Sequence, residues 1–363
     1  MAEVINLLII EPNALIRQTL HSYFKNSKVF KVIGKAYDAK IANIRADSVL
    51  PDIIIFDFSD NYEINLENMK DIFSGFYIPI VFFSTKPLEE VSKIASELGS
   101  LDWSLIEKPN TSLANETTRL LPEIERQLRE LHLSSIMRIE NFKKSNRATR
   151  NSITSIKKSN SAKPLSKQKK ADFICDKVIS IGASTGGTTA LLKIFSSLPK
   201  SMPGIVAVIH MPIRFTGSFA ARLNKLCEIR VVEAKDRQEI KCGQVIIARG
   251  DRHLRVKKIG NRIFTELGGA EQVNGHCPSV DVLFKSVADE LGASGVGVIL
   301  TGMGKDGAAG LGEIMRSGGL TIAQDEGSSA VYGMPKAAVE DGAVQELLPL
   351  DKISLRLAEN YSF

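Results

Sequence analysis

The sequence is poor in the features of disulfide-stapled, metal-binding and membrane-spanning proteins. Its 363 residues include only four cysteines, widely spaced and without a C-x-x-C pair that would indicate a zinc site or a disulfide framework. No apolar run approaches the ~20 residues that a membrane-spanning helix needs. The chain opens without the basic segment and cleavage site of a secretory signal. We therefore expect free thiols, a cytoplasmic location and no membrane insertion.

The positive charge is unevenly distributed. The formal net charge is +6 and the pI is about 9.0, values that by themselves would favour a nucleic-acid partner. Ten of the basic residues, and no acidic one, lie between Lys143 and Lys170, so the rest of the chain is net acidic. Because the basic pI belongs to one segment, we expect no nucleic-acid partner.

The first 138 residues predict a small doubly wound domain. Short apolar runs alternate with amphipathic helix-length segments, the pattern of a parallel sheet with crossover helices. A long helix is expected from 111 to 138, because leucines recur on one face at helical spacing. The candidate strands are 6–10, 30–34, 52–56, 78–83 and 104–106.

Residues 139–172 predict a basic flexible linker. They are rich in serine, asparagine, lysine and arginine and hold few large apolar groups. Such a segment cannot bury enough surface to offset the entropy of ordering. The alternative is a basic tether for acidic partners or a membrane surface, although most charge runs of this kind are simply solvated.

Residues 173–363 predict a second doubly wound α/β domain with a mainly parallel sheet. Most of the glycines lie in this half, clustered at strand ends where the crevice of such a sheet would lie. The candidate strands are 178–182, 204–210, 230–233, 244–248, 295–300 and 320–323, with helices near 187–197, 216–226, 279–291 and 308–317.

Three polar side chains follow strands of this second domain. Ser184 lies at a strand-to-helix turn, where backbone N–H groups can stabilise an oxyanion. His210 ends the next strand, and Asp306 follows a later strand through a glycine-rich loop. In an open α/β sheet such groups meet at one crevice. They form a candidate triad in which serine attacks, histidine takes the proton and aspartate orients the imidazole.

Each of these residues also has an ordinary structural interpretation. A glycine-rich turn after a strand is more often a phosphate-binding loop or a plain turn, a lone histidine is usually structural, and Asp306 could cap a helix. The turn at 182–187 contains no G-x-G-x-x-G, and no acidic residue follows at the distance expected for a ribose, which argues against dinucleotide binding. His253 and His276 lack companion ligands at metal spacing and are assigned as structural or peripheral.

Several motifs of the second domain closely resemble the chemotaxis protein-glutamate methylesterase family. The resemblance covers about 177–353. The motifs are Gly182-Ala-Ser-Thr-Gly-Gly, His210-Met-Pro, Pro278-Ser-Val-Asp-Val-Leu-Phe, Leu300-Thr-Gly-Met-Gly-Lys-Asp-Gly and Tyr332-Gly-Met-Pro.

This resemblance implies a serine esterase that hydrolyses γ-glutamyl methyl esters on methyl-accepting chemotaxis receptors and releases methanol. Deamidation of receptor glutamines is implied as a second activity of the same acyl chemistry, and no cofactor is implied for the esterase. The triad transfers to Ser184, His210 and Asp306, with Thr185 and Met303 shaping the oxyanion site.

One departure from the family concerns the substrate. Cys277 stands where the family motif H-R-P-S-V-D places an arginine. This substitution removes a planar, five-donor group that could contact an acidic partner. It bears on the choice of substrate more than on the reaction.

The region 6–109 resembles a response-regulator receiver domain, which implies a flavodoxin-like fold. Asp57, Ser84 and Lys108 match the phospho-acceptor, hydroxyl and lysine positions of that family. The resemblance implies a histidine kinase as a partner. It also implies a receiver that covers the esterase crevice until the acceptor aspartate is phosphorylated.

The receiver-like region departs from its family at the end of the first strand. Glu11 and Pro12 stand where receivers carry an acidic pair that binds magnesium. Because Pro12 has no carboxylate, we expect weak or absent Mg²⁺ binding and slow or absent phosphorylation of Asp57. A non-catalytic, receiver-type signalling scaffold is the alternative function for the whole chain.

Overall fold

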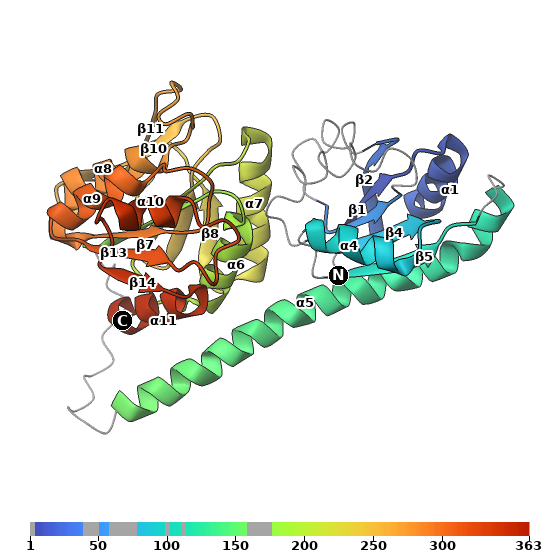
Figure 1. Ribbon diagram of the computed structural model, residues 1–363, viewed down its shortest axis with the longest axis horizontal. Helices are drawn as coiled ribbons and strands as arrows, with labels where there is room; N and C mark the ends of the chain where they lie inside the picture. Colours follow the sequence, from blue (N-terminus) through green and yellow to red (C-terminus); the bar gives the residue numbers. More distant parts are fainter. Residues whose placement is uncertain are drawn as a thin grey trace. The chain divides into compact units, whose positions relative to one another are not determined.

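The computed structural model describes residues 4–38, 51–57, 78–98, 102–109, 114–157 and 176–362. The chain divides into two compact units, Met1–Glu140 and Asn141–Phe363 (Figure 1). None of the helices in the described part combines the length and apolar character needed to cross a membrane.

The first unit is built on a five-stranded parallel sheet in the order β2-β1-β3-β4-β5. This order is that of flavodoxin-like folds, so the predicted fold class is confirmed. One apolar cluster joins side chains of β1, β3 and β4 to those of α1 and the first half of α5. The elements before α5 are β1 (Ile5–Ile10), α1 (Ala14–Lys25), β2 (Phe30–Ala36), β3 (Ile53–Phe56), β4 (Ile80–Ser84), α4 (Leu88–Glu97) and β5 (Trp103–Glu107).

Helix α5 (Ala114–Lys157) is longer than predicted. It continues past residue 138, so the flexible linker predicted from 139 is wrong as far as 157, and residues 158–175 lie outside the described ranges. The reason is compositional. The helix contains no glycine, and its only proline, Pro122, lies near its start, so nothing later interrupts its backbone hydrogen bonds.

The second unit is built on a seven-stranded parallel sheet in the order β14-β13-β12-β6-β7-β9-β8. The chain moves outward from β6 through β7 and later continues at β12 on the other side of β6. Such a reversal opens a crevice at the carboxyl ends of the strands. The strands are β6 (Val178–Ala183), β7 (Gly204–Ile209), β8 (Arg230–Glu233), β9 (Gln244–Ile247), β12 (Gly295–Ile299), β13 (Leu320–Gln324) and β14 (Glu346–Leu348).

The helices of the second unit form two packed groups, which gives the doubly wound arrangement that the sequence predicted. One group is α8 (Val280–Leu291), α9 (Ala308–Arg316) and α10 (Met334–Glu340); the other is α6 (Gly187–Ser197), α7 (Ile213–Leu226) and α11 (Leu350–Tyr361) (Figure 1). One apolar cluster of this unit joins sheet residues to α8 and α9. The catalytic candidates therefore project from a sheet that is rigid beneath them.

An antiparallel hairpin in the second unit was not predicted from the sequence. It consists of β10 (His253–Ile259) and β11 (Arg262–Gly268) and forms a separate two-stranded sheet. The second half of β10 is exposed and carries Lys257 and Lys258. The alternation of apolar and polar residues that would identify a strand is therefore too short to have been recognised.

Because each unit has its own core, we expect core truncations to act on one unit at a time. Phe24 in α1 and Phe284 in α8 are both fully buried, and replacing either by alanine should cost its unit about 3–5 kcal/mol. The single tryptophan, Trp103, lies in β5 against the edge of the Phe82 ring, so its fluorescence reports the first unit.

In urea unfolding, Phe24→Ala should shift the Trp103 fluorescence transition to lower denaturant. Phe284→Ala should leave the Trp103 transition in place. It should move only the unfolding transition of the second unit, followed by circular dichroism, to lower urea concentration. A shift of the tryptophan transition in Phe284→Ala would contradict separate cores.

Candidate active site

Three neighbouring strands of the second unit deliver the predicted triad to one edge of the sheet. Ser184 directly follows β6, His210 directly follows β7, and the loop after β12 carries Asp306. The strand β6 lies between the other two. Backbone hydrogen bonds tie the strand ends together, since Ser184 N–H donates to the Thr301 carbonyl at 3.0 Å and His210 N–H to the Ala183 carbonyl at 3.2 Å. The three residues thus meet where the strand order reverses.

Asp306 is buried and holds the ring of His210. Its Oδ2 lies 2.9 Å from Nε2 of His210. The same carboxylate accepts hydrogen bonds from the Ser279 hydroxyl at 2.7 Å and from the Val280 N–H at 2.6 Å, at the start of α8, where the helix dipole favours an anion. Burial raises the pKa of Asp306, but the hydrogen bonds from His210, Ser279 and Val280 outweigh it and lower the pKa to about 2. Asp306 is therefore an anion at neutral pH.

This anion sets the tautomer of His210. A carboxylate can only accept, so Nε2 of neutral His210 carries the proton and Nδ1 carries the lone pair. Nδ1 is buried and makes no hydrogen bond within the part of the chain that the structure describes. Nor does a hydrogen bond join Ser184 Oγ to His210 across the described ranges; in unliganded enzymes this bond often tightens only when substrate is present. His210 is thus a base with its accepting nitrogen free.

The loop after β12 passes directly over Ser184. A Cβ atom built on Gly302 would lie 2.7 Å from Cβ of Ser184 and 2.3 Å from Sδ of Met334, closer than real atoms approach. Only glycine lets the backbone come this near to the serine. The glycine-rich sequence of this loop is therefore a steric requirement of the site.

The two residues predicted to shape the oxyanion site would act through their backbone N–H groups. Those of Thr185 and Met303, the residues that follow Ser184 and Gly302, make no hydrogen bond among the residues the structure describes. The hydroxyl of Thr301 donates to the Thr185 carbonyl at 2.9 Å, which fixes the orientation of that peptide chain. The Met303 side chain is 73% exposed, so the part of Met303 that can serve the site is its backbone.

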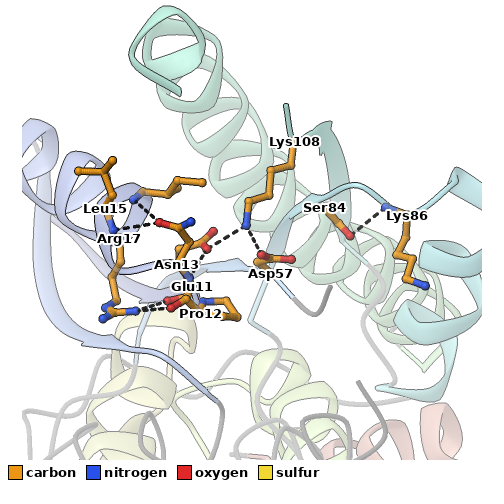
Figure 2. Close-up of polar contacts among 10 residues, drawn as sticks. Glu11, Pro12, Asn13, Leu15, Arg17, Asp57, Ser84, Lys86 and Lys108 are labelled. Carbon is orange, nitrogen blue, oxygen red and sulfur yellow. Dashed lines mark hydrogen bonds and ion pairs between the residues drawn. The ribbon is translucent and has the colours of Figure 1, made fainter. Parts of the chain in front are cut away.

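The residues predicted for the receiver site also meet at a sheet edge. Glu11 follows β1, Asp57 follows β3, Ser84 ends β4 and Lys108 follows β5. Figure 2 shows the ammonium of Lys108 between the two carboxylates; it pairs with Asp57 and lies 2.9 Å from Glu11. The Ser84 hydroxyl accepts a hydrogen bond from the N–H of Lys86 at 3.2 Å.

The backbone carbonyl oxygens at Glu11 and Pro12 already accept hydrogen bonds from the protein. The carbonyls of Glu11 and Pro12 accept hydrogen bonds from the guanidinium of Arg17 at 2.6 and 2.9 Å (Figure 2). The side-chain oxygen of Asn13 caps α1 by accepting from two backbone N–H groups of its first turn.

These contacts do not fit a magnesium ion, which needs an octahedron of oxygen ligands. Pro12 supplies no carboxylate. Burial and the neighbouring Asp57 raise the pKa of Glu11 to about 7, against the lowering effect of Lys108. Across the described ranges, no group of three or more His, Cys, Asp or Glu side chains is arranged to hold a metal.

Comparison with known proteins identifies the family. The CheB methylesterase family model matches residues 179–357. The chain is 38% identical over 360 residues to the protein-glutamate methylesterase/protein-glutamine glutaminase of Sulfurimonas denitrificans, covering 98% of this chain and 97% of that protein. It is also 38% identical over 355 residues to the protein of the same name from Nitrosomonas europaea, covering 97% and 95%. The chain belongs to this methylesterase family.

Among solved structures, the CheB methylesterase catalytic domain of Thermotoga maritima is 42% identical to this chain, covering 50% of it and 97% of that domain with a TM-score of 0.49. The resemblance predicted from the motifs is confirmed, and so is the hydrolase class. A non-catalytic scaffold is correspondingly disfavoured. The roles of individual residues of this methylesterase stay predictions.

Some contacts of the triad were missed from the sequence. The ring of His276 stacks on that of His210, with centroids 3.7 Å apart and planes at 10°. Of the two roles predicted for His276, structural or peripheral, the peripheral one is therefore wrong. Asn274 donates from Nδ2 to Oδ1 of Asp306 at 3.1 Å. The only sequence signal was the dipeptide Asn274-Gly275, which favours a tight turn.

His253 has the structural role that was predicted. It is buried, its Nδ1 accepts from the Ser279 N–H at 3.1 Å, and its Nε2 donates to the Glu271 carbonyl at 2.7 Å. Both ring nitrogens are therefore used to hold the backbone on either side of the turn that carries Asn274.

The close approach of Gly302 to Ser184 generates a prediction. Because the new Cβ of Gly302→Ala would lie too close to Ser184, the loop must move away from the serine. This movement should slow labelling of Ser184 by a fluorophosphonate on the order of 100-fold. Gly327→Ala is the matched control, because a Cβ at Gly327 meets nothing within 4 Å. Equal labelling rates in the two variants would show that the loop does not shape the site.

Proposed function

We propose that this methylesterase hydrolyses γ-glutamyl methyl esters on methyl-accepting chemotaxis receptors and deamidates receptor glutamines with the same residues. The observation that supports this best is the buried Asp306–His210 pair beside Ser184 at the reversal point of the sheet. The names of the relatives cover both activities. An ester and a primary amide of glutamate differ only in the leaving group, so one acyl-transfer site can serve both.

The first half of the proposed reaction is acylation. Ser184 Oγ attacks the ester carbonyl carbon while Nδ1 of His210 takes the hydroxyl proton. Asp306 stabilises the imidazolium that forms. The N–H groups of Thr185 and Met303 donate to the oxyanion of the tetrahedral intermediate.

The second half is release. The intermediate collapses as the imidazolium of His210 gives its proton to the departing methoxide, so methanol leaves and the glutamyl group stays esterified to Ser184. Water then attacks this acyl ester while His210 takes a proton from the water molecule. His210 returns that proton to Ser184 Oγ as the C–Oγ bond breaks, and the glutamate carboxylate is released. With a glutamine substrate, ammonia leaves in place of methanol.

Loss of any triad member should stop this reaction while the fold persists. Ser184→Ala, His210→Ala and Asp306→Asn should each lower methanol release from methyl-labelled receptor by about 10³-fold or more. The double variant Ser184→Ala/His210→Ala should be little worse than Ser184→Ala, because groups that act as a unit lose activity non-additively.

The control for the serine variant is Ser197→Ala, whose hydroxyl donates to the Lys193 carbonyl within α6. It should release methanol at the normal rate. Full activity in Ser184→Ala would remove the triad as the source of hydrolysis.

We propose that the first unit acts as a docking module and that phosphorylation of Asp57 does not switch the activity of the enzyme. This proposal is supported by the lack of a carboxylate at Pro12 and by the ammonium of Lys108, which pairs with both Asp57 and Glu11. Phosphoryl transfer to a carboxylate depends on a divalent cation to neutralise the developing charge. Phosphoryl transfer from a histidine kinase to Asp57 should therefore be slow.

Substitution at residue 12 tests this proposal. The natural chain should bind Mg²⁺ weakly and gain neither phosphate nor activity from acetyl phosphate. Pro12→Asp supplies the missing carboxylate and should strengthen Mg²⁺ binding and speed phosphorylation of Asp57. Pro12→Ala is the control, because it removes the ring without adding a ligand. Activation of the natural chain by acetyl phosphate and Mg²⁺, abolished by Asp57→Ala, would overturn the proposal.

A further inference from the structure

The segment 269–279 between β11 and α8 ends in a tight turn. Val273 and His276 exchange two backbone hydrogen bonds of 3.0 Å. Asn274 and Gly275, between them, both have positive φ, at 54° and 80°. This is the backbone of a two-residue hairpin loop, which Asn-Gly favours strongly. The turn is therefore a defined structure of its own.

The turn is anchored on both sides by one buried residue. His253, at the start of β10, donates to the Glu271 carbonyl before the turn and accepts from the Ser279 N–H after it. Its own N–H also donates to the Gly269 carbonyl at 3.3 Å. The hairpin of β10 and β11 thus holds the turn in place through His253.

From this anchored position the turn reaches both members of the Asp306–His210 pair. Asn274 Nδ2 donates to Asp306 at 3.1 Å and to Oδ2 of Asp281 at 2.5 Å. The imidazole of His276 lies flat against that of His210. One side chain of the turn therefore constrains the carboxylate, and the other constrains the ring.

The ring of His210 needs such a constraint. Its hydrogen bond to Asp306 fixes Nε2 but leaves the ring able to tilt about that contact, which would swing Nδ1 away from Ser184. A parallel ring at 3.7 Å blocks the tilt on one face. It also places an aromatic face beside a group that becomes cationic when it takes the serine proton, and a neutral aromatic face favours a cation.

We propose that His276 is a positioning residue for the proton transfer of His210, and that it acts through the stacked face of its ring. This inference rests on the proposed function, since it assigns His210 as the base. Burial and the neighbouring His210 lower the pKa of His276, against the opposing effect of Asp306, which favours the neutral ring of His276. The charged groups that act on its pKa are His210 and Asp306.

Two substitutions in the full chain separate this role from a structural one. His276→Ala removes the face, and its kcat for methanol release from methyl-labelled receptor should fall on the order of 10- to 100-fold with KM little changed. His276→Phe keeps a flat ring without a titratable group and should restore most of the kcat. A residue that only held the turn or bound the receptor would change stability or KM instead.

The control is Val273→Ala, which shortens a part-exposed side chain of the same turn and should keep the normal kcat. If His276→Ala does not fold, His276→Gln, which has comparable length and no aromatic face, takes its place. A normal kcat in the variant without the ring would overturn the inference, and so would a kcat in His276→Phe as low as in His276→Ala.

His210→Ala in the same assay distinguishes this inference from the proposed function. If His210→Ala is inactive while His276→Ala keeps full kcat, only the role of His276 is lost. If His210→Ala remains active, the proposed catalytic roles fail, and the inference fails with them.

Discussion

The structure of the catalytic unit depends on satisfying one buried anion. A carboxylate taken out of water must recover its hydrogen bonds from the protein, and Asp306 recovers them from three separate parts of the chain: the residue after β7, the tight turn, and the start of α8, where Ser279 and Val280 both donate. Each donor is thereby drawn to the same point. The geometry of the histidine, the position of α8 and the placement of the turn are all set by this charge.

Both units place side chains at the carboxyl edge of a parallel sheet, but the chemistry at the two edges differs. In both, parallel strands bring side chains distant in sequence to the carboxyl edge of a sheet. In the second unit the charge that gathers there is balanced by hydrogen-bond donors, which leaves a base free to act. In the first, the ammonium of Lys108, a cation that belongs to the chain itself, pairs with both carboxylates. One edge therefore leaves a base free to react, and the other holds its own cation between its two acids.

Much of this could be predicted from sequence because the relevant signals are local. Short apolar runs indicated the buried strands of both sheets, and strand ends indicated Ser184, His210 and Asp306. The part of α5 after residue 138 was missed because its sequence, rich in serine, asparagine, lysine and arginine, has the composition of a linker. The contact of His276 with His210 was missed because stacking joins residues 66 positions apart through a hairpin whose exposed strands lack clear alternation. No local pattern encodes such a contact.

The register between β6 and β7 has a consequence for the geometry of proton transfer. Ala183 is paired with Ile209, so Ser184 and His210 are the next residues along the same ladder, one rung further. Neighbouring strands are spaced about 4.8 Å apart by their hydrogen bonds, and Nδ1 is the ring nitrogen nearer the main chain. The spacing of the two main-chain positions is therefore set by the sheet, so only the side-chain torsions and the tilt of the imidazole can change the separation of Ser184 Oγ and Nδ1. A one-residue slip between the two strands would abolish this arrangement.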